Sequence, residues 1–274
     1  MLEPVRNHPA LLHTEKKHRT LIVADLHLGW EISLAQKGVH IPSQSTKILR
    51  KLLTVIDITN PRTLVILGDV KHTIAKAESG EWKDIPEFFE AIQAKIDDIR
   101  VIRGNHDGNL EPLLPKGVQL QPSTGITLDN VGFFHGHTWP AKRLLNCKTL
   151  VMGHVHPTLS FRDTLGYKIM APVWIEIGLD HRKLALPSRK IRHSKSAAPS
   201  SDNRRYPAKL QAKQLLIIPC FNDFLGGRPM NKRGPHKGYV GPLMRSEAID
   251  IEKGRVYLLD GTFLGTVEQL RGLS

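Results

Sequence analysis

Residues Ile99–Asp107 read Ile-Arg-Val-Ile-Arg-Gly-Asn-His-Asp, and this stretch decides the fold. A short apolar run that stops at a glycine is typical of a buried strand. We therefore expect Asn105, His106 and Asp107 to follow directly after the carboxyl end of a strand. In open α/β sheets, that end is where ligands bind. Because these side chains can bind a metal or move a proton, the stretch predicts a functional site at a sheet edge.

The same arrangement recurs at four other strand or hairpin ends. The apolar runs that predict these strands are Thr20–Ala24, Thr63–Leu67, Val131–Phe134 and Thr149–Met152. They deliver Asp25 and His27, Asp69, His135 and His137, and His154 and His156. A single aspartate or histidine at a strand end is more often a cap, a turn residue or a core residue. Five such ends together predict a shared site.

The pair Asp25 and His27 shows how such a site would be built. Along an extended backbone, alternate side chains point the same way. We therefore expect Asp25 and His27 to chelate one ion, while Leu26 turns away from it.

Helical patterns separate the strands in the first half of the chain. Ser43 or Ser45 is expected to cap a helix that runs to about residue 56. A second helix is expected over Ile85–Ile96, with Pro86 in its first turn. Three alternations of strand and helix predict a βαβ architecture with a mostly parallel sheet.

Beyond Pro122 the pattern indicates a second sheet. Gly125–Leu128 and Val131–Phe134 flank two turn residues like the arms of a hairpin. The further elements expected here are a short helix over Ala141–Leu145, an extended segment over Ala171–Ile177, an ordered segment over Gln214–Pro219, and a closing pair of strands over Ala248–Ile251 and Val256–Asp260.

Composition bounds the class of protein. The chain has 274 residues, of which 40% are hydrophobic and 24% charged, which is ordinary for a folded protein. We expect one domain over residues 1–274 with a flexible basic insertion at about Leu186–Lys213, where Asp202 is the only acidic residue. The net charge of +13 favours polyanionic partners, although a generally basic surface is an equally good explanation.

The cellular compartment is inferred from what the sequence contains. Cys147 and Cys220 are too few for a disulfide scaffold or a cysteine-based zinc site, so a reduced cytoplasm is the simplest expectation. The segment Met1–Arg19 lacks the apolar core of a signal peptide. No apolar run approaches the roughly 20 residues that cross a bilayer, so no membrane association is expected.

The mixture of donor types favours a catalytic metal site. Carboxylate, amide and imidazole ligands without thiolates suit two divalent ions, Mn²⁺ first, with Fe²⁺, Zn²⁺, Co²⁺ or Ni²⁺ as alternatives. Two ions about 3.5–4 Å apart clamp the attacking and leaving oxygens of a displacement at phosphorus. One carboxylate must then bridge them.

Five motifs carry a resemblance to a known family. Asp-Leu-His, Gly-Asp-Val, Gly-Asn-His-Asp, His-Gly-His and Gly-His-Val-His occur in this order over residues 25–156. Together they resemble the signature of the calcineurin-like metallophosphoesterases. The resemblance implies an α/β fold, an αββα sandwich in which two mixed sheets are flanked by helices.

The resemblance also implies roles for the residues. Asp25, His27 and His156 would hold the first metal; Asn105, His135 and His154 would hold the second; Asp69 would bridge both. His106, pinned by Asp107, would stabilise the phosphoryl transition state or protonate the leaving group. His137 would be either a ligand or a residue just behind the ligands.

A closer resemblance, to the ICC-like branch of phosphoesterases, rests on longer motifs such as Asp-Leu-His-Leu-Gly-Trp-Glu and Phe-Asn-Asp-Phe-Leu-Gly-Gly-Arg-Pro. It implies an association with prokaryotic DNA ligases or helicases. Trp30 and Trp139, which stand beside the motifs, would stack on substrate bases or simply pack.

Three functions are therefore compatible with the sequence. The leading hypothesis is a dinuclear phosphoesterase that cleaves phosphodiester or phosphomonoester bonds in DNA, as a nuclease or an end-processing enzyme in repair. The second hypothesis keeps the metals but takes small nucleotides as substrates. The third is a non-catalytic subunit of a helicase or ligase.

Overall fold

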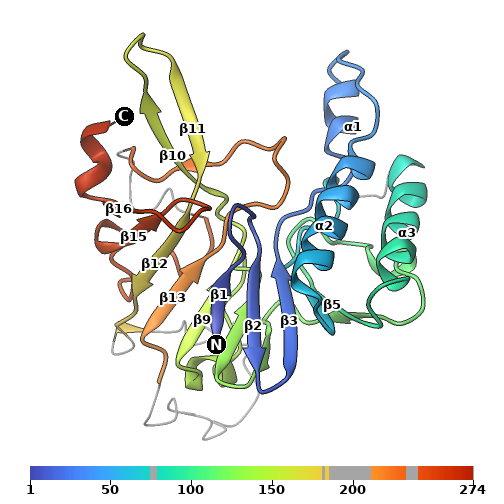
Figure 1. The fold of residues 1–274 in the computed structure, drawn as a ribbon, viewed down its shortest axis with the longest axis horizontal. Helices are drawn as coiled ribbons and strands as arrows, with labels where there is room; N and C mark the ends of the chain where they lie inside the picture. The colour runs from blue at the N-terminus through green and yellow to red at the C-terminus, as the bar shows by residue number, and fades with distance from the viewer. Residues whose placement is uncertain (75–78, 181–182, 185–210, 233–239, 274) are drawn as a thin grey trace, which may run out of the picture.

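The computed structural model describes residues 1–74, 79–180, 183–184, 211–232 and 240–273. Two large β-sheets pack against each other (Figure 1). The first has the order β1-β2-β3-β4-β5-β6, with bounds Leu2–Pro4, Leu11–Glu15, His18–Val23, Thr63–Ile66, Asp98–Ile102 and Val118–Gln121. Strands β3 to β6 are parallel, so the expected βαβ architecture is confirmed.

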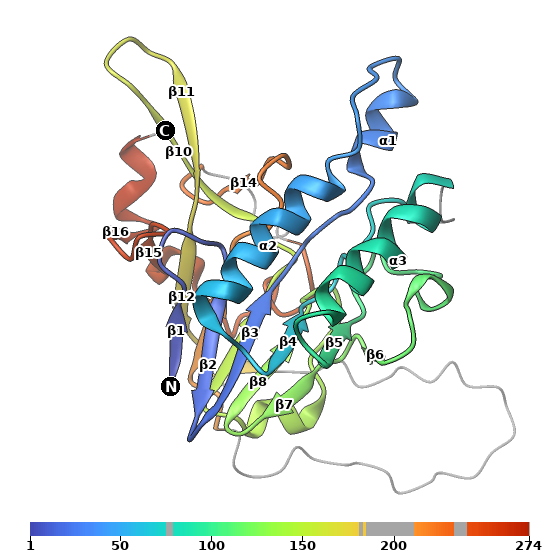
Figure 2. The same cartoon turned by 45° about the vertical axis from the view of Figure 1, so that its right-hand side comes forward.

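Two α-helices, α2 (Ser45–Thr59) and α3 (Ser79–Gln93), cover one face of the first sheet (Figure 2). The alternation of side chains along β3 explains this arrangement. Leu21 and Val23 pack in the core shared with the helices, whereas Ile22 lies in the core between the two sheets. One buried strand therefore serves two apolar layers, which is why its sequence is apolar without interruption.

The ends of these helices differ from the prediction. Helix α3 begins at Ser79, so Pro86 lies inside the helix and not in its first turn. The residue that caps α2 is Gln44, and neither serine does so. The Ser43 hydroxyl oxygen instead accepts a hydrogen bond from the backbone N–H of Ser45, at 3.2 Å. A further short helix, α1 (Trp30–Ala35), follows the first ligand motif.

The second sheet has the order β16-β15-β12-β13-β9-β8-β7. The bounds are Phe263–Thr266, Arg255–Tyr257, Trp174–Gly178, Gln214–Ile217, Thr149–Met152, Val131–Phe134 and Ile126–Leu128. The predicted hairpin is confirmed as β7 and β8, and β8 runs parallel to β9. A smaller sheet, β11-β10-β14, lies beside it, with bounds Lys168–Pro172, Pro157–Arg162 and Arg228–Pro229.

The predicted closing pair of strands is wrong. Ile251–Lys253 form a 3₁₀ helix, so the chain does not turn there between two strands. Strand β15 pairs instead with β16, where Val256 lies opposite Gly265. Ala248–Ile249 contribute only an isolated bridge, between Leu179 and Ile249.

The outer face of the second sheet carries its own core. Residues of β9, β12 and β13 pack there against short 3₁₀ helices, at Lys142–Asn146, Ile251–Lys253 and Gln269–Leu273. The expected fold of two mixed sheets with helices outside them is confirmed. In the described part of the chain, the helices on this second side are 3₁₀ helices.

Two expectations concern the chain as a whole. The predicted basic insertion, at about Leu186–Lys213, lies outside the described residues except for its last three. Among the residues that the structure describes, there is no helix with the length and apolar character needed to cross a membrane.

Candidate metal centre

The predicted ligand residues lie at the carboxyl ends of strands from both large sheets. Asp25, Asp69 and Asn105 follow β3, β4 and β5 of the first sheet. His135 and His154 follow β8 and β9 of the second. A direct contact joins the two sets, because the backbone N–H of His154 donates to the Asp25 carboxylate at 3.0 Å. Residues 129 positions apart are thereby brought into one site.

Asp25, His27 and His156 form the first group of possible ligands. One donor atom from each lies within 4.8 Å of the other two. The His156 Nε2 atom is 3.4 Å from Asp25 Oδ1 and 3.3 Å from His27 Nε2. Two imidazole nitrogens that face each other this closely need a proton or a cation between them. This donor set fits a divalent ion.

Asp69, His135 and His154 form a second group that shares no residue with the first. The His135 Nε2 atom lies 3.1 Å from His154 Nδ1, 3.1 Å from the Asn105 side-chain oxygen and 3.4 Å from Asp69 Oδ2. On its other side, His135 Nδ1 is 2.6 Å from the carbonyl oxygen of Leu67. A hydrogen bond donated to that carbonyl fixes the orientation of the ring and directs Nε2 into the site.

Asp69 belongs to the second group and also approaches the first. Its Oδ2 atom is 3.4 Å from His135 Nε2 of the second group and 3.6 Å from His27 Nε2 of the first. Its Oδ1 atom accepts a hydrogen bond from the backbone N–H of His106, at 2.8 Å. A methyl group on Gly104 would lie 2.2 Å from Asp69 Oδ1, so only glycine fits there. The Asp69 carboxylate is therefore held in place, with one oxygen directed at histidines of both groups.

Backbone strain is concentrated at these ligands. Positive φ angles occur at five of them: Asp25 (60°), His27 (43°), Asp69 (51°), His154 (68°) and His156 (46°). The expectation that Asp25 and His27 share a side because the backbone is extended is therefore wrong. Their side chains meet because both residues adopt the left-handed conformation. Such strain costs about 1–3 kcal/mol per residue and clusters at functional sites.

Buried charges perturb the pKa values of the site. Burial opposes protonation of His156, but the neighbouring Asp25 charge outweighs it and raises the pKa of His156 to about 11. Burial is likewise outweighed by the Asp69 charge at His135, whose pKa rises to about 9. Burial lowers the pKa of His27 to about 3 and that of His154 to about 4. The carboxylates thus favour positive charge within both ligand groups.

His106 and Asp107 are arranged differently from the prediction. The His106 Nδ1 atom contacts the carbonyl oxygen of His72, whereas Asp107 is directed at backbone. The Asp107 carboxylate accepts hydrogen bonds from the N–H groups of Gly104 (2.7 Å), Asp69 (2.8 Å) and Val70 (2.8 Å). Asp107 therefore does not pin the His106 ring. It ties the loop after β5 to the loop after β4.

His72 belongs to the site although it was not predicted as a site residue. Its ring centroid is 5.4 Å from that of His27 and 5.6 Å from that of His106. These three histidines form a further group whose donor atoms lie within 4.8 Å of one another. The sequence signal was its position three residues after Asp69.

The remaining predicted residues lie around the ligands. The His137 ring is 5.2 Å from that of His135 but joins none of the ligand groups, and burial lowers the pKa of His137 to about 4. Trp139 packs against the core of the second sheet. Trp30 stacks on Phe224, with ring centroids 5.5 Å apart and an interplanar angle of 17°.

Cys220 is a second neighbour that sequence reasoning missed. Its thiol lies 3.1 Å from the carbonyl oxygen of Asp25, and burial raises the pKa of the thiol. The segment Cys220–Arg228 touches the ligand loops of both sheets. No local pattern signals this contact, because nearly 200 residues separate it from Asp25.

The chain is similar to known proteins in sequence and in fold. A sequence model for the calcineurin-like phosphoesterase family matches residues 18–182. The solved structure of the nuclease MPE from Pseudomonas putida is similar in fold, with 19% identity, 96% of this chain and 100% of that chain covered, and a TM-score of 0.52. No curated protein sequence matches.

Two other solved structures are similar over part or most of the chain. YfcE, a phosphoesterase from E. coli, is 22% identical over 53% of this chain and 73% of its own, with a TM-score of 0.34. A predicted phosphoesterase from Streptococcus pneumoniae is 12% identical over 92% of this chain and 95% of its own, with a TM-score of 0.29. At these identities the family match, and not the structural likeness, carries the assignment.

Proposed function

The chain belongs to the calcineurin-like phosphoesterase family and is a metal-dependent hydrolase, and from that premise we propose that it cleaves phosphodiester bonds in nucleic acid with two divalent cations. Mn²⁺ is the first expected ion. Fe²⁺, Zn²⁺, Co²⁺ and Ni²⁺ suit the same donors. The observation that carries the proposal is that Asp69, which lies 3.4 Å from His135 in the second group, is also only 3.6 Å from His27 in the first.

The residues present would divide two ions between them. Asp25, His27 and His156 would hold one ion; Asn105, His135 and His154 would hold the other; Asp69 would contact both. When bound, such ions supply Lewis-acid polarisation of phosphoryl oxygens and activation of water.

His106 is the proposed proton donor. Its Nδ1 atom is hydrogen-bonded to the carbonyl oxygen of His72. Its Nε2 atom faces the proposed metal ligands and lies 4.0 Å from Asp69 Oδ2. The His106 side chain is 21% exposed, so a substrate can reach it. When protonated, Nε2 can donate to a phosphoryl oxygen or to the leaving oxygen. Asp107 is a positioning residue, because it ties the backbone of Gly104, two residues before this histidine, to the loop after β4.

Nucleic acid is proposed as the substrate because of charge. An excess of 13 positive charges attracts polyphosphates and releases their counterions on binding. The similar structure from Pseudomonas putida is named a nuclease, which is consistent with such a substrate. A role in DNA repair, a helicase or ligase partner and a cytoplasmic location remain part of the proposal.

Metal analysis combined with parallel assays tests the proposal. The purified protein, loaded with Mn²⁺ and dialysed, should retain two ions per chain by mass spectrometry of the metal. It should then hydrolyse methyl p-nitrophenyl phosphate and labelled single- and double-stranded DNA, and EDTA should stop both reactions.

Other outcomes would favour the alternative functions. Turnover of small esters and cyclic nucleotides without any cleavage of DNA would remove the nuclease assignment. Metal retention without hydrolysis of any ester, together with a copurifying helicase or ligase, would favour a non-catalytic subunit.

A further inference from the structure

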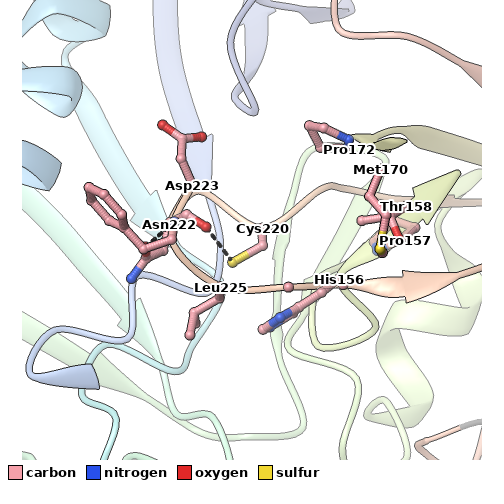
Figure 3. A pocket seen from close by; sticks show the side chains of 12 residues that line it. His156, Pro157, Thr158, Met170, Pro172, Cys220, Asn222, Asp223 and Leu225 are labelled. Atoms are coloured by element: carbon pink, nitrogen blue, oxygen red, sulfur yellow. Dashed lines mark hydrogen bonds between the residues drawn. The ribbon is translucent and has the colours of Figure 1, made fainter. Parts of the chain in front are cut away.

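A cavity of about 320 Å³ opens beside the first ligand group. His156 and Cys220 lie at its base, and two walls rise from them (Figure 3). One wall is a loop that carries Asn222, Asp223 and Leu225, and the other comes from β10 and β11 and carries Pro157, Thr158, Met170 and Pro172. Phe224 of the same loop also lines the cavity. Because His156 is both a proposed ligand and part of the base, the cavity adjoins the place where the scissile phosphate would bind.

The loop wall is held rigidly by backbone contacts. The N–H of Phe221 donates to the carbonyl of Ala24 at 2.9 Å, and the Asn222 side-chain amide donates to the carbonyl of Leu26 at 2.9 Å. At its far end, the N–H of Arg228 donates to the carbonyl of His156 at 2.9 Å. The wall is thus anchored to the ligand loops of both sheets. Because the loop is already held in place, a ligand that binds against it loses little binding free energy to the ordering of the loop.

The same wall presents an aromatic surface with positive charge. Phe224 is 42% exposed although its ring stacks on Trp30. The Lys47 ammonium nitrogen lies 5.3 Å from the centroid of the Phe224 ring. Lys51 anchors the loop by donating to the carbonyl of Phe221, at 2.8 Å, and its charge is paired with that of Asp223, at 2.6 Å, so Lys47 supplies the positive charge of this wall. Aromatic rings beside cationic side chains are the usual combination for stacking a base and attracting its phosphate.

The opposite wall offers a polar group without a partner. Thr158 is 8% exposed, and its hydroxyl has no hydrogen-bond partner among the described residues. The hydroxyl oxygen is shielded from solvent. A hydroxyl both donates and accepts, so it can bond the edge of a base once the Thr158 side chain rotates toward the cavity. Met170 supplies apolar contact from the same wall and is 38% exposed.

We propose that this cavity binds the nucleobase of the nucleotide next to the scissile phosphate, with Phe224 as the stacking surface. The inference rests on the proposed function, because it places the phosphate at the ligand groups. The cavity volume is at the small end of the range for ligand pockets, about 300–1,000 Å³. It therefore suits one base at a time.

Two substrates with the same leaving group test the proposal. The p-nitrophenyl ester of thymidine 5′-monophosphate and methyl p-nitrophenyl phosphate are both phosphodiesters, and only the first carries a base. The ratio of their kcat/KM values therefore reports recognition of the base. Phe224→Ala should lower this ratio about tenfold, the effect expected for loss of one base stack. Phe224→Trp should restore it.

A matched control comes from another exposed aromatic residue. Phe263 is 51% exposed and lies on β16, on a strand that carries none of the ligand loops. Phe263→Ala should leave the ratio unchanged. An unchanged ratio in Phe224→Ala, or a fall that Phe224→Trp fails to restore, would overturn the proposal.

Binding without turnover separates this inference from the proposed function. The anisotropy of a fluorescein-labelled oligothymidylate, measured in EDTA, should show about tenfold weaker binding for Phe224→Ala than for the wild type or Phe263→Ala. If the wild type hydrolyses neither ester but Phe224→Ala still weakens binding, the phosphodiesterase proposal fails and the base site stands. If both esters are hydrolysed but Phe224→Ala binds normally, the base site fails alone.

Discussion

The two large sheets hold their ligands in different ways. In the first sheet, one buried carboxylate, that of Asp107, ties the loops after β4 and β5 together through three backbone N–H groups. In the second sheet, the histidines depend on partners from elsewhere in the chain. The N–H of His154 donates to Asp25, and the carbonyl of His156 accepts from Arg228.

This difference shows which part of the centre can form by itself. Neighbouring parallel strands place Asp69, Asn105 and His106 through contacts within the first sheet. His154 and His156 reach the other candidate ligands only when the two sheets are packed together and the segment Cys220–Arg228 contacts both. Five predictions test this contrast, and they are ordered from the largest expected effect to the smallest.

Asp69 is the residue on which both ligand groups depend. Asp69→Asn removes the charge shared by the two groups, so we expect a loss of turnover of at least about 10³-fold and weaker retention of both ions. Activity on methyl p-nitrophenyl phosphate and metal content after dialysis measure the two effects. Asp57→Asn, at an exposed carboxylate of α2 paired with Lys95, is the matched control. Wild-type turnover in Asp69→Asn would show that the bridging assignment is wrong.

His106 separates chemistry from metal binding within the first sheet. His106→Ala should lower kcat by about 10²–10⁴-fold, the usual contribution of a positioned proton donor. Metal content should stay at the wild-type value, because His106 belongs to neither of the two proposed ligand groups. Loss of an ion together with the rate would make His106 a ligand and contradict its proposed role.

Gly227 tests the dependence of the second sheet on the distant segment. A methyl group at this position would lie 2.2 Å from the carbonyl oxygen of His156. Gly227→Ala should therefore shift His156 and weaken the ion held with Asp25 by about 10–100-fold, as disturbed support of a ligand commonly does.

The neighbouring glycine provides the control for this test. A methyl group on Gly226 meets nothing within 4 Å, so Gly226→Ala should bind both ions normally. Titration of the metal by calorimetry distinguishes one weakened site from two. Equal weakening of both sites in Gly227→Ala would argue against the contrast between the sheets.

The pH dependence of metal binding differs between the two groups. Without metal, His156 and His135 hold protons at neutral pH, because their pKa values are raised to about 11 and about 9. Binding must displace these protons, so affinity should rise with pH by up to about tenfold per unit for each one displaced. The rise should stop near pH 9 for the His135 group and continue beyond it for the His156 group.

The same shifts determine the stability of the metal-free protein. A raised pKa in the folded state contributes stability that is fully present below the ordinary histidine value of 6.5 and is lost as pH rises through the folded value. As pH rises from 6.5 to 11, the thermal unfolding temperature of the metal-free protein should therefore decrease relative to that of the metal-loaded protein. Parallel profiles for the two forms would contradict the assigned protonation.

The local sequence pattern was sufficient to locate the strands that end at a candidate ligand. The apolar runs before Asp25, Asp69, Asn105, His135 and His154 end where β3, β4, β5, β8 and β9 end, within one or two residues. Pattern failed at the closing strands, because β15 pairs with β16 on one side and with the distant strand β12 on the other, and local periodicity does not reveal partners.

The sequence by itself determined the family, the parallel strands of the first sheet and the residue types that gather at the sheet edges, because strand periodicity and short motifs are local properties. Tertiary structure alone decided that Asp107 supports backbone, that His72 and Cys220 join the site, and that Phe224 stacks on Trp30. The left-handed backbone of five ligands was likewise decided there. These features depend on contacts between residues up to about 200 positions apart, whose relative positions exist only after the two sheets have packed.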